Sequence, residues 1–154
     1  MSSPFGTSLR RNPEDPRSLV ERIDAVMVER LEEAADFVCL DLMVERRRRH
    51  GRALPDAKND RDREEFTALV RDFLRHLREA FRRELSEEDR PRADQAESRA
   101  GSGEVARLMA LQVWLAKQLP DYWQRFEASR DAFAREHLAA PPPKPGFLGQ
   151  LFGR

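Results

Sequence analysis

The chain has 154 residues, which is enough for one domain with its own hydrophobic core. Its 28 basic and 28 acidic residues cancel, so no net charge points to a polyanion or a membrane surface as the partner. No apolar run approaches the ~18 residues that span a bilayer, and the N-terminal residues lack the hydrophobic core of a signal peptide, so we expect a cytoplasmic protein.

The amino-acid composition indicates the fold class. Ala, Leu, Glu and Arg dominate the chain, β-branched residues are sparse, and most glycines lie outside the periodic segments. These preferences favour helix over strand. The single cysteine, Cys39, lies in an apolar run, where we expect a buried structural thiol. The sequence therefore predicts an all-α protein.

Residues 1–15 form the first segment, which contains two prolines before Asp15 and no apolar periodicity. We expect a disordered arm here. Its apolar side chains Phe5 and Leu9 leave docking on a groove as the alternative.

The first predicted helix covers residues 16–49. Asp15 before Pro16 fits an N-cap followed by a first helical residue, because proline's missing N–H costs nothing at that position. Apolar residues then recur at helical spacing, namely Val20, Ile23, Met27, Leu31, Ala34, Val38 and Leu42. We expect the helix to end near Arg49.

The second half of this helix is unusually apolar. Residues 34–44 contain only two polar side chains, Asp36 and Asp41, which indicates burial on more than one side of the helix. These two carboxylates are about 140° apart around a helix and so do not form one metal-binding pair. We expect them to be solvent-edge or salt-bridged groups.

A basic run closes the first helix, with Gly51 as its C-cap. Its arginines are Arg46, Arg47, Arg48, Arg49 and Arg52. Cations near a helix C-terminus are stabilised by the macrodipole, which is the ordinary role of such a run. The functional alternative is contact with an anion, either lipid or an acidic protein surface. Nucleic acid is not favoured, because no aromatic residues interleave with the arginines.

Residues 62–85 form the second predicted helix. Asp62 with Glu65 resembles a capping box, and one apolar stripe faces the core. Residues 86–102 follow as a polar loop, with a short helical turn around residues 93–99.

The third predicted helix covers residues 103–138. Residues 105–119 are apolar around most of the circumference, and the apolar phase continues unbroken past Pro120. We therefore expect one helix kinked at Pro120. The three helices predict an antiparallel bundle over residues 16–138. Residues 34–44 and 105–119 carry more apolar surface than such a bundle hides, which predicts a homodimer or a hetero-oligomer.

No motif points to catalysis, a cofactor or a metal ion. The three histidines, His50, His76 and His137, lack a carboxylate at Glu-x-x-His spacing, and one cysteine cannot build a thiolate zinc site. Phosphate loops, nucleophile elbows and dinucleotide fingerprints are absent from the sequence. Tyr122 and Trp123 fit a core position better than a ligand stack. We expect a protein that is not an enzyme.

The C-terminal segment is a Pro-rich spacer, residues 139–145, followed by an apolar peptide, residues 146–154. We expect this peptide to dock on a partner through Phe147, Leu148, Leu151 and Phe152. Its last seven residues, Leu-Gly-Gln-Leu-Phe-Gly-Arg, resemble the targeting peptides of encapsulin cargo proteins. They are also similar to the short amphipathic membrane-targeting ends of some bacterial cell-division proteins.

These observations predict an interaction or adaptor protein that associates through apolar helix faces and is tethered by its C-terminal peptide. Two alternatives stay open. One is a peripheral membrane protein that uses the tail and the basic run, and the other is a cargo protein enclosed in a shell.

Overall fold

A computed structural model describes residues 17–139. The predicted N-terminal arm, the Pro-rich spacer and the docking peptide lie outside the described residues, apart from Ala139 at the start of the spacer. Within residues 17–139 the chain is all-α, which confirms the predicted class. The helices are α2 (Leu19–Arg49), α3 (Asp60–Arg83), α4 (Asp89–Ser98), α5 (Glu104–Gln118) and α6 (Tyr122–Ala139).

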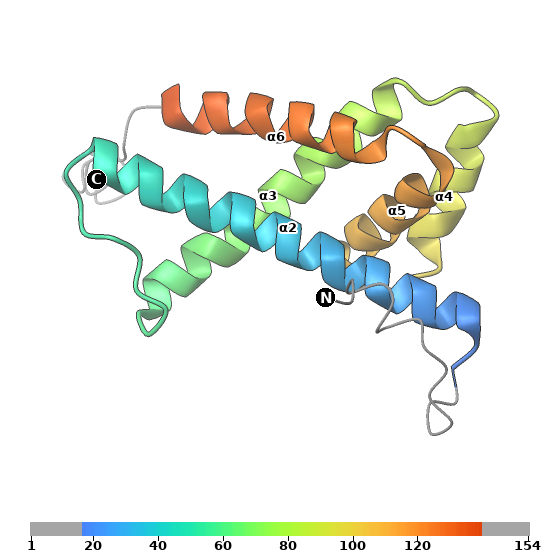
Figure 1. Cartoon of the computed structure of the whole chain (residues 1–154), viewed down its shortest axis with the longest axis horizontal. Helices are drawn as coiled ribbons and strands as arrows, with labels where there is room; N and C mark the ends of the chain where they lie inside the picture. The colour runs from blue at the N-terminus through green and yellow to red at the C-terminus, as the bar shows by residue number, and fades with distance from the viewer. Residues whose placement is uncertain (1–16, 140–154) are drawn as a thin grey trace, which may run out of the picture.

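Two long helices and a shorter third one make up the body of the fold. Figure 1 shows α2 and α6 running in the same direction, with α3 crossing behind them in the opposite sense. These three helices contact one another, while α4 and α5 form a hairpin at one end. Helix α5 also packs on α2 and α3. The described residues thus form five helices where the sequence predicts three.

The prediction of one long third helix kinked at Pro120 is wrong. Helix α5 ends at Gln118, and Leu119 has an extended backbone with φ −106° and ψ 116°. The proline ring crowds the residue before it and disfavours the helical conformation there. The Tyr122 N–H donates to the Leu119 carbonyl at 3.2 Å, which closes a turn before α6 begins in a new direction.

The ends of α2 show how local capping sets the helix boundaries. The predicted start at Pro16 is too early, because Ser18 is extended and its hydroxyl accepts a hydrogen bond from the Glu21 N–H at 3.2 Å. The helix ends at Arg49 as predicted. Gly51 has φ +63°, and the Arg52 N–H donates to the Arg47 carbonyl at 2.8 Å, as in a Schellman motif.

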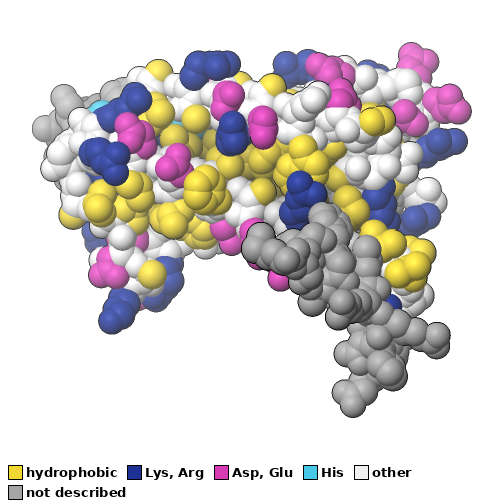
Figure 2. Space-filling view, viewed as in Figure 1, with side chains coloured by type: hydrophobic (Ala, Val, Ile, Leu, Met, Phe, Trp, Pro, Cys, Tyr) yellow, Lys and Arg dark blue, Asp and Glu magenta, His cyan; other side chains and the backbone are white. Residues whose placement is uncertain are grey.

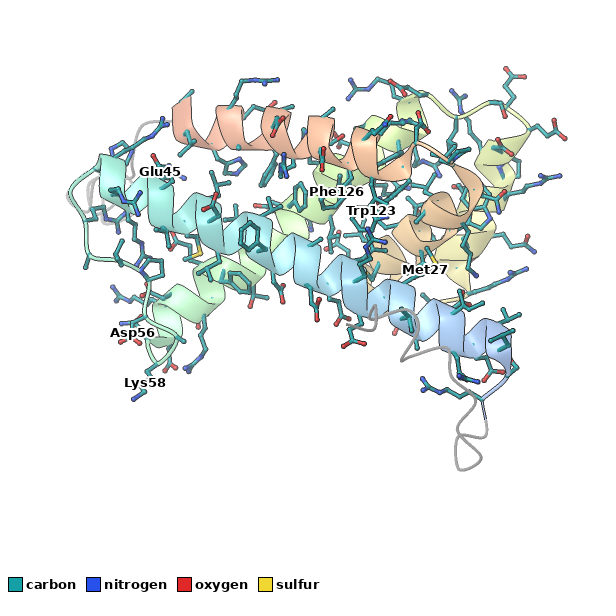
Figure 3. All side chains as sticks on the ribbon, in the orientation of Figure 1. Met27, Glu45, Asp56, Lys58, Trp123 and Phe126 are labelled. Carbon is teal, nitrogen blue, oxygen red and sulfur yellow. The ribbon has the colours of Figure 1, made fainter. Side chains whose placement is uncertain are left out.

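Helix α3 begins two residues before its predicted start, because the Asn59 side chain accepts a hydrogen bond from the Asp62 N–H at 3.1 Å. Its last residue is Arg83, two residues before the predicted end. Asp56 and Lys58 lie in the loop between α2 and α3 (Figure 3).

Helix α4 occupies most of the segment that the sequence predicts as a loop. It packs on α5 and buries Ala93 completely. Ion pairs from Arg78 to Glu97 and from Arg82 to Asp94 join α3 to α4. Helix α4 therefore covers one side of α5, which accounts for much of the apolar circumference of residues 105–119.

An aromatic cluster fills the core between α3 and α6. It consists of Phe73, Phe81, Tyr122, Phe126 and Phe133, all nearly inaccessible to solvent. Phe73 meets Phe126 edge-on, with ring centroids 5.5 Å apart, and Tyr122 stacks on Phe81 at 5.1 Å. The Tyr122 hydroxyl donates to the Gln112 side-chain oxygen at 2.6 Å, which joins α6 to α5 inside the core. These contacts fix the frame on which the outer face of α2 is presented.

Candidate interaction surface

The middle of α2 exposes large apolar side chains on its outer side. Phe37 is 72% exposed and Leu40 is 50% exposed, although their neighbours Val38 and Cys39 are buried. The two exposed residues are three positions apart and so share one helix face. Figure 2 shows hydrophobic side chains gathered along this face of the molecule. We refer to Phe37 and Leu40 as the α2 stripe.

Exposed carboxylates surround the α2 stripe. They belong to Glu29, Glu32, Glu33, Asp36 and Asp41. Among the described residues, no basic side chain forms a salt bridge with any of these five. Partial burial raises the pKa of Asp36 above its ordinary value. The guanidinium of Arg30, also on α2, lies over the Trp123 ring at 4.2 Å, and Trp123 projects from α6 toward α2 (Figure 3).

A groove of about 600 Å³ lies beside the α2 stripe, between α2, α3 and α5. Its lining is Val28, Glu32, Ala35 and Asp36 of α2, Val70 of α3, Ala100 of the preceding loop, and Val105, Ala106, Met109 and Ala110 of α5. The small alanine side chains leave space between the helices. Glu32 and Asp36 therefore belong both to this groove and to the surroundings of the α2 stripe.

The predicted basic run does not form one free cationic patch. Arg47 is largely buried and donates hydrogen bonds to Asp62 and Glu65 on α3. The hydrogen bond to Asp62 is the largest cause that raises the pKa of Arg47, and the bond to Glu65 adds to it. The same bond between Arg47 and Asp62 lowers the pKa of Asp62. Arg48 and Arg49 pair with Glu45 one turn earlier, at the end of α2 seen in Figure 3.

The other two arginines of the run differ in their surroundings. Arg46 is partly buried and has an interaction partner, and Arg52 is exposed in the loop after α2. Within the run, Arg47 therefore stabilises the junction between α2 and α3, and Arg48 and Arg49 form pairs within α2. The predicted docking residues Phe147, Leu148, Leu151 and Phe152 lie outside the described residues.

Other residues singled out in the sequence occupy structural positions. Cys39 is fully buried, and burial raises its pKa to about 12. His76 packs against the Phe133 ring, with centroids 5.4 Å apart. Burial also raises the pKa of Tyr122. Both carboxylates of the apolar half of α2, Asp36 and Asp41, are exposed as expected.

The groove was not predicted from the sequence. Val70, Val105 and Met109 come from helices far apart in the chain, and each fits an ordinary apolar stripe in its own segment. The alanines on facing sides of α2 and α5 were the available signal, but their meaning depends on which helices meet.

Two further features that could suggest a function are metal sites and membrane-spanning helices within residues 17–139. In this range no group of three or more His, Cys, Asp or Glu side chains is placed to hold a metal ion. None of the helices there has the length and hydrophobicity that crossing a membrane requires.

Comparisons of the chain with protein-family models, with curated proteins and with solved structures give no match. Within the described residues, the exposed surface of α2 is therefore the feature that suggests a function.

Proposed function

We propose that the protein is a non-enzymatic adaptor whose α2 stripe binds a partner protein. The observation that carries this proposal is the 72% exposure of Phe37 in the middle of a long helix whose opposite side packs in the core. Aromatic anchors of this kind dominate binding energy at protein interfaces when a partner covers them.

Charge favours a particular kind of partner. Five carboxylates surround the α2 stripe and lack salt bridges to the rest of the described chain. A partner that presents apolar side chains flanked by Lys or Arg would bury the stripe and compensate these charges. In a twofold homodimer through α2, the same patch faces itself, so carboxylates would approach carboxylates. A basic, apolar partner is therefore our proposal, and the homodimer is its rival.

The C-terminal peptide, residues 146–154, supplies a second contact in this proposal. Two weak contacts on one chain strengthen each other, because the first raises the effective concentration of the second. The membrane alternative is less favoured than the adaptor, since Arg47, Arg48 and Arg49 already form salt bridges with carboxylates within the chain. We retain a cytoplasmic location as part of the proposal.

The test compares the full-length wild type with two variants. Proteins retained by the immobilised wild type are identified, and the affinity of each purified candidate is then measured. We expect the double substitution Phe37→Ser and Leu40→Ser to lower the affinity for the true partner at least about fivefold. This change corresponds to the ~1 kcal/mol that defines an energetically significant contact. The matched control is Leu54→Ser, because Leu54 is 58% exposed but lies in the loop after α2.

Three results would contradict the proposal. If the double variant binds every partner with the affinity of the wild type, the α2 stripe is not part of the interface. If the wild type forms a stable dimer and the double variant is a monomer, the α2 stripe is a homodimer interface instead. Salt-sensitive binding to anionic phospholipid vesicles, lost with Leu148→Asp and Leu151→Asp but unaffected at the α2 stripe, would support the membrane alternative.

A further inference from the structure

The groove between α2, α3 and α5 has a chemistry that restricts its occupant. Eight of its ten lining residues are apolar, and Val105 on the α5 side is 42% exposed. Its only charged lining residues are Glu32 and Asp36, which lie one turn apart on α2. A suitable occupant therefore carries bulky apolar side chains for the groove and cations directed toward α2.

The N-terminal segment of the same chain has this pattern. Phe5 and Leu9 are its bulky apolar residues, and Arg10 and Arg11 follow immediately. Residues 1–13 contain no Asp or Glu, so nothing in this stretch would be repelled by the carboxylates of the groove. The segment and the groove are thus complementary in both polarity and charge.

The chain length allows the segment to reach the groove. Leu19 begins α2, and Glu32 lies thirteen positions later, which is about 20 Å along a helix. Leu9 lies ten positions before Leu19, and an extended chain of that length spans up to about 33 Å. Leu9 can therefore lie level with Glu32 if the segment turns back along α2. Phe5, four residues earlier, can then reach the level of Asp36.

We infer that residues 5–11 dock in the groove between α2, α3 and α5 of their own chain, with Phe5 and Leu9 inserted and Arg10 and Arg11 facing Glu32 and Asp36. Covalent attachment supports this occupant over a free peptide, because a short tether gives an effective concentration on the order of millimolar. The groove shares Glu32 and Asp36 with the surroundings of the α2 stripe, so docking would leave three of the five carboxylates for a partner. The inference itself does not depend on the proposed adaptor function. It also implies that any outside ligand of the groove must displace the segment.

The experiment places a photo-crosslinking residue at position 5 of the full chain, as Phe5→p-benzoylphenylalanine. The protein is irradiated at a dilution where light scattering finds a monomer, and the crosslinked peptides are identified by mass spectrometry. We expect crosslinks within one chain to Met109 and Val105, which line the groove. The same photo-crosslinking residue at position 54 is the control and should give no crosslink to α5.

Charge substitutions test the predicted orientation. The double variant Glu32→Lys and Asp36→Lys should lose the crosslinks, and adding Arg10→Glu and Arg11→Glu should restore them. The matched control, Glu29→Lys with Asp41→Lys, makes the same charge change at exposed α2 positions that do not line the groove, and should keep the crosslinks. All these α2 positions are exposed, so circular dichroism should show an unchanged fold.

Salt gives a second measurement that needs no substitution. The crosslink yield of the wild-type sequence should fall in 1 M salt, where the Debye length is about 3 Å. Crosslinks between two chains would show that a second copy is the occupant. Crosslinks outside the groove, or groove crosslinks that neither salt nor charge reversal changes, would also overturn the inference.

Discussion

The exposure of Phe37 makes a quantitative prediction about stability. Full burial of a phenylalanine contributes about 1.5–3 kcal/mol, and only the 28% of Phe37 that is covered can contribute in the free protein, or about 0.4–0.8 kcal/mol. Alanine is the better helix former by up to about 0.7 kcal/mol, which offsets this loss. We expect Phe37→Ala to change the free energy of unfolding by less than about 0.5 kcal/mol, or about 2 °C in Tm.

Phe73 provides the matched control, because it is a phenylalanine in a helix with no exposed surface. Phe73→Ala should cost about 3–5 kcal/mol, since it removes contacts and leaves a cavity. Urea unfolding followed by circular dichroism measures both variants at a dilution where the protein is monomeric. If Phe37→Ala costs more than about 2 kcal/mol there, its side chain is covered in solution and the argument for the α2 stripe fails.

Three further predictions concern the frame that presents this surface. Tyr122→Phe should cost about 1–3 kcal/mol, because it leaves the buried Gln112 oxygen unpaired, and adding Gln112→Leu should recover most of that loss in a urea double-mutant cycle. Asp62→Asn should lower stability at pH 7, and this loss should shrink as the pH falls below about 4. Arg47 holds the pKa of Asp62 below its usual value, so this stabilisation is complete above the unfolded pKa of about 3.9 and is lost as pH falls through the lower folded pKa. Gly51→Ala should cost about 1–2 kcal/mol, because its φ of +63° strains any residue with a Cβ although no atom lies within 4 Å to clash.

Each of these predictions has a control within the chain. For the hydrogen bond, a loss in the double variant equal to the sum of the losses in the two single variants would show that the pair is not coupled. Asp60→Asn is the control for Asp62→Asn, because Asp60 is 82% exposed and, within residues 17–139, pairs only with nearby Arg63. Gly103→Ala should cost less than Gly51→Ala, since Gly103 has an ordinary φ of −76°. A smaller loss at Gly51 would argue against the left-handed cap.

The helical class and the boundaries of α2 and α3 were largely readable in the sequence because they depend on local patterns. Apolar spacing, Gly51 and the basic last turn identify α2 before any packing is known. The break at Pro120 was missed because apolar phase does not distinguish one bent helix from two helices that share a core. Leu115 and Tyr122 are both buried on either side of the break. The restriction that proline places on Leu119 was the decisive signal.

Where α4 lies, the sequence predicts only a short helical turn within a loop, for a different reason. It has one fully buried residue, Ala93, and no apolar stripe, so its sequence resembles a polar loop. Its position depends on α5 and on ion pairs with α3, which are contacts between segments distant in the chain. Since α4 covers α5, the predicted surplus of apolar surface in residues 105–119 was too large. The surplus in residues 34–44 persists as the exposed Phe37 and Leu40.

The neutral net charge conceals an uneven distribution that affects binding. Arginines of α3 form salt bridges with carboxylates of α4 and α5, as in the pairs Arg78–Glu97 and Arg75–Glu104. The carboxylates around the α2 stripe have no such partners within the described residues. Covering Phe37 with an uncharged apolar surface would therefore desolvate carboxylates without compensation, which is unfavourable. The same helix that offers apolar contact area thus discriminates against neutral and acidic partners, and favours a surface that brings its own cations.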